Sequence, residues 1–258
     1  MTQRWIVVEG LVNVRDLGGL PTRDGRHVRT GRLLRGDSVH DLPAASVEHL
    51  VDVLGVRDVV DLRTGVERDL VGEGPLDADD RVRVHRHSLV RDSVARGHAA
   101  EAALAIPWDN KTVVRDAAFW ARHYGSYLRG RPDSVSSALR VLASGSGATF
   151  VHCAAGKDRT GTVVAMALDV AEVPHEEIVT DYALSAERIE AIIERLMTFP
   201  GYAATLAGRS VADEAPRPEA MSAFLTALAD EHGGTVGWLR AHGWSAADID
   251  DLRRRLTA

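Results

Sequence analysis

Residues 152–161 read His-Cys-Ala-Ala-Gly-Lys-Asp-Arg-Thr-Gly, and Cys153 is the only cysteine in the 258-residue chain. The four residues before this stretch, 148–151, are mostly apolar and partly β-branched, which is typical of a buried strand. Residues 161–168 are almost all apolar, which indicates a buried helix. The sequence therefore predicts a strand, a short loop and a helix in direct succession. In that arrangement, the backbone N–H groups of the loop can point at a common anion.

The residue types in this loop suit a thiolate that attacks phosphate. Only the thiolate form of cysteine is a good nucleophile, and a helix N-terminus, backbone amides and a guanidinium all favour it. Arg159 follows Cys153 by six positions, and its planar fork can hold two phosphate oxygens. We therefore expect Cys153 to be the nucleophile and Arg159 to stabilise the charge on the transferring phosphoryl group.

The other loop residues have predicted roles around these two. Thr160 can hydrogen-bond the sulfur and ease its departure from a thiophosphate, and His152 can brace the loop. Glycine at position 156 lets the backbone approach the phosphate closely. The residues predicted to bind the phosphate from the loop are Ala154, Ala155, Gly156, Lys157 and Thr160.

Two other interpretations of the loop fit less well. A buried structural cysteine beside a surface Lys-Asp-Arg cluster would leave the whole set of loop residues without a reason. A nucleotide-binding P-loop needs Ser or Thr after its lysine and glycine at position 151, whereas this chain has Asp158 and Val151.

The loop resembles the signature loop of cysteine-dependent protein tyrosine phosphatases, and its Ala-Gly-Lys-Asp-Arg filling is similar to that of bacterial tyrosine/lipid phosphatases. The resemblance extends to residues 13–19 (Asn-Val-Arg-Asp-Leu-Gly-Gly), 31–35 (Gly-Arg-Leu-Leu-Arg), 59–64 (Val-Val-Asp-Leu-Arg-Thr), 181–185 (Asp-Tyr-Ala-Leu-Ser) and 238–253. It implies hydrolysis of phosphomonoesters through a phosphocysteine, without a cofactor. The implied substrates are proteins with phosphotyrosine or phosphoserine/threonine, or phosphoinositides.

Three carboxylates compete for the role of general acid, which protonates the leaving oxygen. In the family that the chain resembles, the aspartate of the loop has this role, so Asp158 is the first candidate. Asp61 ends a predicted strand whose carboxyl end should face the same crevice, but it could equally pair with Arg63. Asp109 is the weakest candidate, because it lies too far before the loop. Arg63 is also expected to attract the phosphate, with Arg32 or Arg35 as further candidates.

The predicted fold is a three-layer α/β domain spanning residues 1–258, with a central, mostly parallel sheet, flanking helices and extra C-terminal helices. Strands are expected near residues 57–62, 82–88 and 148–152, and antiparallel edge strands within the first 35 residues. The Arg15-Asp16 and Gly18-Gly19 pairs are interpreted as structural, and Pro200-Gly201 as a break between helices. Relatives can cover the site with a helical lid, which residues 90–118 or 186–215 would supply.

Composition excludes several classes of partner. A net charge of −6 argues against general binding of nucleic acid. The sequence contains no window of 18 apolar residues, so we predict no membrane span. A single cysteine rules out an internal disulfide. The N-terminus shows no signal-peptide core, so we expect a cytoplasmic protein, although some relatives are exported without such a signal. His85 and His87 have the spacing of a metal pair, but no third ligand suggests itself, and we predict no metal site.

Two functions of other classes stay open at this point. A non-hydrolysing phosphate-binding module could keep the loop without the chemistry, although the intact Arg159 and Thr160 disfavour decay. A sulfurtransferase has a similar loop between its cysteine and arginine, although the resemblance outside the loop disfavours sulfur transfer.

Overall fold

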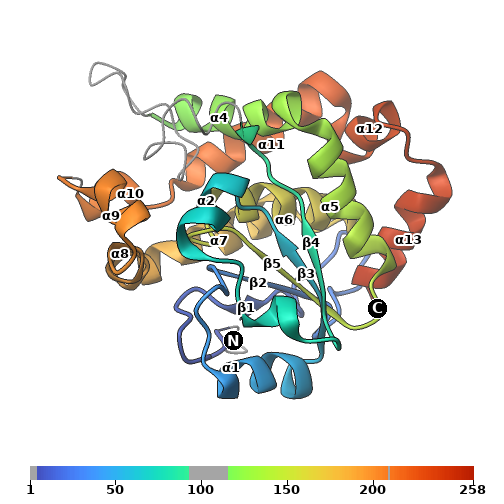
Figure 1. Ribbon diagram of the computed structural model, residues 1–258. Coiled ribbons are helices and arrows are strands. Elements are labelled where there is room, and N and C mark those ends of the chain that lie inside the picture. Colours follow the sequence, from blue (N-terminus) through green and yellow to red (C-terminus); the bar gives the residue numbers. More distant parts are fainter. Residues whose placement is uncertain (1–4, 93–115, 209) are drawn as a thin grey trace.

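A five-stranded sheet lies at the centre of the protein (Figure 1). The computed structural model describes residues 5–92, 116–208 and 210–258. The strand order is β1-β2-β5-β3-β4, and only the edge strand β1 is antiparallel to its neighbour. The strands are β1 (Arg15–Asp16), β2 (Leu33–Gly36), β3 (Val56–Asp61), β4 (Arg83–Arg86) and β5 (Ala148–His152). The predicted mostly parallel sheet is confirmed.

Helices cover both faces of this sheet, so the three-layer prediction is also confirmed (Figure 1). The α-helices of the described residues are α1 (Ala44–Glu48), α2 (Gly65–Val71), α4 (Ala117–Gly130), α5 (Pro132–Ser144), α6 (Asp158–Val170), α7 (His175–Ala183), α8 (Ile189–Met197), α9 (Pro200–Leu206), α10 (Val211–Glu214), α11 (Pro218–His232), α12 (Gly234–Ala241) and α13 (Ala246–Leu256). A π-helical turn, His49–Val53, extends α1, and two 3₁₀ turns span Pro75–Ala78 and Leu184–Arg188.

Two hydrophobic cores separate the layers. Neighbouring residues of one strand point to opposite faces, so Phe150 joins the core under α1 while Val151 joins the core under α4–α7 and α11–α13. Val59 and Val60 divide in the same way. Because both faces are covered, β5 is mostly apolar, and Val59 and Val60 of β3 are adjacent apolar residues rather than alternating ones. This is why residues 148–151 and 56–62 could be recognised from the sequence.

Two local predictions need correction. Residues 33–36 do not form an antiparallel edge strand, because β2 lies inside the sheet and is parallel to β5; only β1 fits that description. The predicted break between helices exists, but it lies at residues 198–199 rather than at Pro200-Gly201, since Pro200 is the first residue of α9. Proline is favoured there because its fixed φ suits a helix start and its missing N–H would have no helical partner.

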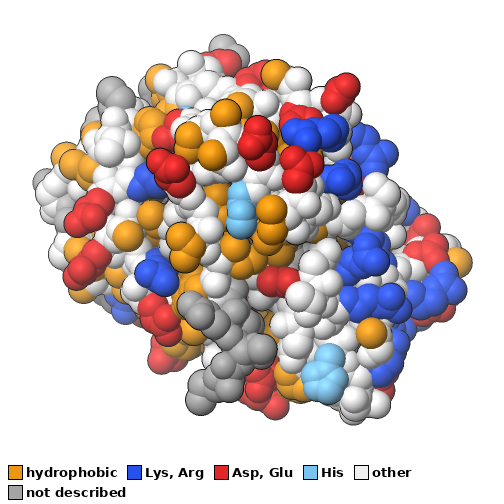
Figure 2. Space-filling view, turned by 90° about the horizontal axis from the view of Figure 1, so that it is seen from below, with side chains coloured by type: hydrophobic (Ala, Val, Ile, Leu, Met, Phe, Trp, Pro, Cys, Tyr) orange, Lys and Arg blue, Asp and Glu red, His pale blue; other side chains and the backbone are white. Residues whose placement is uncertain are grey.

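The surface carries both signs of charge. On the face shown in Figure 2, basic side chains gather toward one edge, whereas acidic and hydrophobic side chains are spread over the rest. None of the helices among the described residues is both long enough and apolar enough to cross a bilayer.

Candidate active site

The Cys153–Lys157 loop joins β5 to α6 at the carboxyl edge of the sheet, where the segments that follow β2 and β3 also arrive. Cys153 is 2% exposed. It lies in a cavity of about 30 Å³ whose floor is the loop and the start of α6 and whose roof comes from α8, α9 and α10. The lining residues are Cys153, Ala154, Ala155, Lys157, Asp158, Arg159, Ile189, Ile192, Ile193, Leu196, Leu206 and Glu214.

Gly156 is required by the packing of the loop on the end of β2. Its φ is +68°, in the left-handed region, and a Cβ there would lie 2.3 Å from the carbonyl oxygen of Gly36. The loop is therefore packed directly on the backbone at the end of β2. The sequence suggested close approach to a phosphate as the reason for this glycine, and the structure adds the close approach to β2.

Arg159 is held by a buried carboxylate that the sequence analysis did not identify. Its two terminal nitrogens donate to the two oxygens of Glu67 at 2.5 and 2.8 Å. Burial opposes the charged guanidinium, yet the Glu67 carboxylate keeps the pKa of Arg159 well above its usual value. Glu67 also caps α2 reciprocally with Thr64, and it accepts a hydrogen bond from the Tyr202 hydroxyl at 3.2 Å.

Asp158 begins α6 and lines the cavity between a tyrosine and a lysine. One carboxylate oxygen accepts a hydrogen bond from the Tyr124 hydroxyl at 2.8 Å, and the other lies 3.5 Å from the Lys157 ammonium. Burial and the charge of Asp158 raise the pKa of Tyr124 well above its usual value, so this hydroxyl stays a donor. Tyr182 contacts the same hydroxyl at 2.6 Å.

Lys157 joins the loop to the roof of the cavity. Its ammonium donates to the backbone carbonyl of Glu214 in α10 and lies 3.7 Å from the carboxylate of the same residue. The indole of Trp120 lies 5.8 Å from this ammonium. Lys157 is therefore buried beneath α10 while facing the cavity that contains Cys153.

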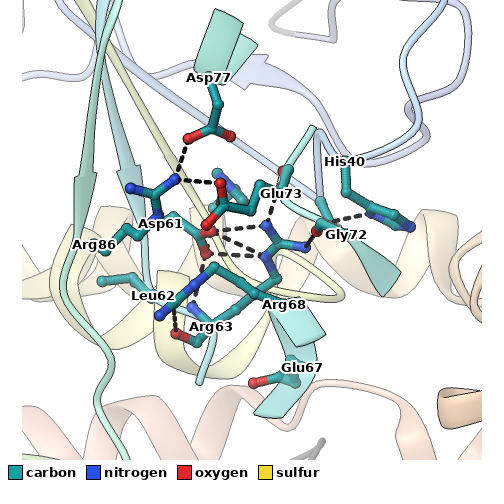
Figure 3. Close-up of polar contacts among 12 residues, drawn as sticks. His40, Asp61, Leu62, Arg63, Glu67, Arg68, Gly72, Glu73, Asp77 and Arg86 are labelled. Atoms are coloured by element: carbon teal, nitrogen blue, oxygen red, sulfur yellow. Dashed lines mark hydrogen bonds and ion pairs between the residues drawn. The ribbon is translucent and has the colours of Figure 1, made fainter. Parts of the chain in front are cut away.

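Asp61 and Arg63 pair with each other outside the set of residues that line the cavity (Figure 3). Arg63 holds both oxygens of Asp61 and also donates to the carbonyls of Gly72 and Glu73. Burial alone would raise the pKa of Asp61, but His152 and Arg63 hold it below its usual range. The pair thus fastens the end of β3 to the far end of α2.

His152 and Thr160 lie beneath the loop. The His152 ring lies 3.2 Å from the carbonyl of Cys153 and 3.9 Å from Asp61, and burial lowers its pKa to about 4. The Thr160 hydroxyl is buried and has no hydrogen-bond partner among the described residues. Its predicted bond to the sulfur stays a prediction.

The remaining sequence candidates lie elsewhere. Asp109 falls outside the described residues, as does most of the segment 90–118. His85 lies 2.9 Å from Asp58, and its ring stacks on that of His87. No group of three or more potential metal ligands occurs in the described part of the chain.

Glu67, Tyr124 and Tyr202 are the residues of this site that sequence reasoning missed. Thr64 and Glu67 have the spacing of a capping box after a predicted strand, so the start of α2 could have been recognised. The pairing of Glu67 with Arg159, 92 positions away, leaves no such local signal.

The model of the tyrosine phosphatase family matches residues 6–258. The chain belongs to this family. A tyrosine-protein phosphatase of Nostoc commune is 35% identical over 127 residues, which are 45% of this chain and 42% of the relative. A Cupriavidus necator protein assigned to the tyrosine-protein phosphatases is 29% identical, over 94% of this chain and 81% of its own. The triple specificity protein phosphatase PtpB of Mycobacterium tuberculosis is 26% identical, over 95% and 96% of the two chains.

Family membership identifies the chain as a protein-tyrosine-phosphatase-like enzyme. The match with the Nostoc protein spans less than half the length of that relative, whereas the other two are covered over most of their lengths.

Proposed function

We propose that the protein hydrolyses phosphate monoesters through a phosphocysteine on Cys153. The observation that carries this proposal is the cavity in which Cys153, Arg159 and Asp158 meet, with Arg159 fixed by Glu67. A nucleophile, a guanidinium for the equatorial oxygens and a carboxyl group for the leaving oxygen are the parts that phosphoryl transfer needs.

The reaction proceeds in two displacements. The Cys153 thiolate attacks phosphorus, the bond to the ester oxygen breaks, and that oxygen takes the proton of the Asp158 carboxyl group. Water then attacks the phosphocysteine and gives its proton to the Asp158 carboxylate. The sulfur–phosphorus bond breaks, inorganic phosphate leaves and the thiolate is restored, with the Thr160 hydroxyl as the group that stabilises it.

Asp158 is the better candidate for the acid because it lines the cavity, whereas both oxygens of Asp61 are bound by Arg63. The same pairing makes Arg63 a support of β3 and α2 rather than a phosphate ligand. We assign phosphate contacts instead to the backbone of residues 154–157, with Lys157 and Arg159 as the cations.

The leaving group of the substrate would contact an apolar surface formed by α8 and α9. Ile189, Ile192, Ile193 and Leu196 project from α8 into the cavity, and Leu206 from α9. Such a surface suits the ring of phosphotyrosine better than a short polar alcohol. Phosphotyrosine is therefore the first expected substrate, with phosphoserine/threonine or phosphoinositides as further ones, since Lys157 can pair with a second phosphate. The Mycobacterium tuberculosis relative is named a triple specificity protein phosphatase, which supports this breadth.

Helices α8, α9 and α10 act as a lid in this proposal. A cavity of about 30 Å³ holds one or two water molecules, which is too little for a phosphorylated side chain. Substrate therefore enters only when these helices move, and the contact between Lys157 and Glu214 breaks as they do.

Phosphate release from p-nitrophenyl phosphate by the wild type and by Cys153→Ser tests the function. We expect the variant to be inactive yet to retain the melting temperature of the wild type and to bind tungstate. Equal rates for both proteins would refute the phosphocysteine route. Tungstate binding without turnover by the wild type would favour a phosphate-binding module, and formation of thiocyanate from thiosulfate and cyanide would favour a sulfurtransferase.

The substrate class is tested on a panel of phosphopeptides and phosphoinositides. We expect the highest kcat/KM on phosphotyrosine peptides. Replacing Ile192 and Ile193 by serine should raise KM for these peptides more than KM for small alkyl phosphates such as methyl phosphate. Activity toward free nucleotides alone would contradict the proposal.

A further inference from the structure

Four peptide carbonyls of the phosphate loop accept hydrogen bonds from residues at or near the ends of β1 and β2. The Ser38 amide donates to Ala154 at 3.1 Å, and the Asn13 side-chain amide donates to Ala155 at 2.9 Å. Arg35 donates to the carbonyl of Gly156 at 2.8 Å and reaches that of Lys157 at 3.4 Å. Each of these donors belongs to a segment far from the loop in the sequence.

Fixing these carbonyls also fixes the amides that face the cavity. In a planar trans peptide, the C=O of one residue and the N–H of the next point in opposite directions. Carbonyls of residues 154–157 that are held toward β1 and β2 therefore turn the N–H groups of residues 155–158 the other way. None of these four N–H groups has an acceptor among the described residues. Gly156 and Lys157 are buried, where N–H groups without an acceptor are rare, and this arrangement suits an anion.

Two of these donors, Arg35 and Asn13, are themselves held in place by one buried carboxylate. Asp181 of α7 accepts from Arg35 at 2.7 Å and from Arg15 at 3.0 Å, and both guanidiniums are almost fully buried. Arg15 in turn donates to the side-chain oxygen of Asn13 at 2.8 Å, which orients the Asn13 amide toward the loop. Arg15 thus pairs with Asp181 rather than with its neighbour Asp16.

Stability alone is a weak reason for this arrangement. Buried ion pairs repay little more than their cost of desolvation, and the Nε of Arg35 has no partner among the described residues. Preorganised dipoles, by contrast, stabilise a developing charge without any rearrangement during the reaction.

We propose that Asn13, Arg35 and Asp181 are positioning residues that aim the loop amides at the phosphate. The inference rests on the proposed phosphate cradle and deepens it. It also gives a positioning role to the motifs at residues 13–19, 31–35 and 181–185, to which the sequence alone assigned no such role. None of the three touches the cavity itself.

The first test compares Arg35→Lys with Arg15→Lys. Both variants keep the positive charge beside Asp181, but a lysine at position 35 cannot hold Asp181 and the Gly156 carbonyl together as a planar fork does. We expect Arg35→Lys to lower both kcat and the affinity for tungstate by ~10-fold or more, the size of effect that misplaced oxyanion donors produce. Arg15 acts on the loop only through Asn13, whereas Arg35 contacts it directly, so Arg15→Lys, at matched loss of melting temperature, should lower them severalfold less. Equal losses in the two variants would overturn the proposal.

A second pair keeps the proposal testable if Arg35→Lys does not fold. Asn13→Ala removes the donor to Ala155, whereas Ser185→Ala removes a hydroxyl that contacts the same Arg15 and Asn13 but not the loop. Only Asn13→Ala should weaken tungstate binding, measured by calorimetry. Unchanged binding in Asn13→Ala would overturn the inference. Because binding is measured without turnover, a wild type that bound tungstate but hydrolysed nothing would refute the proposed hydrolysis and leave this comparison valid.

Discussion

Removing the charge of Glu67 should separate the folding role of its pair with Arg159 from the catalytic one. The pair is fully buried, with both oxygens of Glu67 engaged by Arg159. Glu67→Gln keeps the size of the side chain, and glutamine also serves in capping boxes, so the start of α2 is preserved. The substitution thus removes the negative charge of Glu67 from beside a buried guanidinium and turns an amide N–H toward a donor.

The expected magnitude follows from this geometry. Breaking a buried ion pair by removing one partner costs ~3–5 kcal/mol. For a chain of this length, each kcal/mol shifts the melting temperature by about 2–4 °C, so a loss of ~3 kcal/mol corresponds to about 6–12 °C. An arginine displaced by about 1 Å lowers kcat by ~100-fold.

Tungstate distinguishes the electrostatic explanation from simple destabilisation. The dianion supplies the negative charge that Glu67→Gln lacks, so saturating tungstate should raise the melting temperature of the variant more than that of the wild type. Glu73→Gln is the control, because Glu73 is half-exposed and pairs with Arg86. Its expected effect is below ~1 kcal/mol. The reasoning is refuted if Glu67→Gln and Glu73→Gln have the same melting temperature, the same kcat and the same rise of melting temperature with tungstate.

Three further predictions concern the acid, the lid and pH. Asp158→Asn should lower kcat on tyrosyl phosphates by ~100-fold, but far less on p-nitrophenyl phosphate, whose leaving group needs no proton; a uniform loss would move Asp61 to first place. In hydrogen exchange, amides of residues 200–214 should exchange faster than those of 161–170, and equal protection would contradict a moving lid. Burial lowers the pKa of both His123 and His152 to about 4, so the unfolded chain takes up their protons first. Stability is therefore complete above pH 6.5 and falls toward pH 4, by ~2 kcal/mol per histidine at pH 5; His123→Gln should lessen this fall in urea titrations.

The central elements could be predicted because their signals are local. Residues 148–151, the loop and residues 161–168 are consecutive in the sequence, and burial on both faces makes residues 148–151 mostly apolar. The position of β2 could not be predicted in this way. Four residues, Leu33–Gly36, carry no signal for a place inside the sheet, which depends on pairing with β5 more than a hundred positions later.

The candidate site divides along the same line. Asp158 and Arg159 follow from the loop, and both line the cavity. Asp61 was expected at the carboxyl edge of the sheet, and it lies there, but Arg63 binds both its oxygens. That competition depends on side-chain directions after the strand ends, which spacing does not determine. The open alternative for Asp61, pairing with Arg63, is the one that the geometry favours.

Three buried ion pairs surround the phosphate loop, and their positions suggest a common purpose. Glu67 holds Arg159 at the rim, Asp181 holds Arg35 beneath the loop, and Asp61 holds Arg63 where α2 is fastened to β3. Each pair adds little to stability after desolvation. Each also fixes a dipole or charge that would otherwise reorient in water. In the proposed mechanism, a thiolate and a phosphoryl group, both anionic, approach each other, which requires that compensating positive groups are already in place. The ion pairs therefore provide, in the folded protein, the orientation that solvent would have to supply during the reaction.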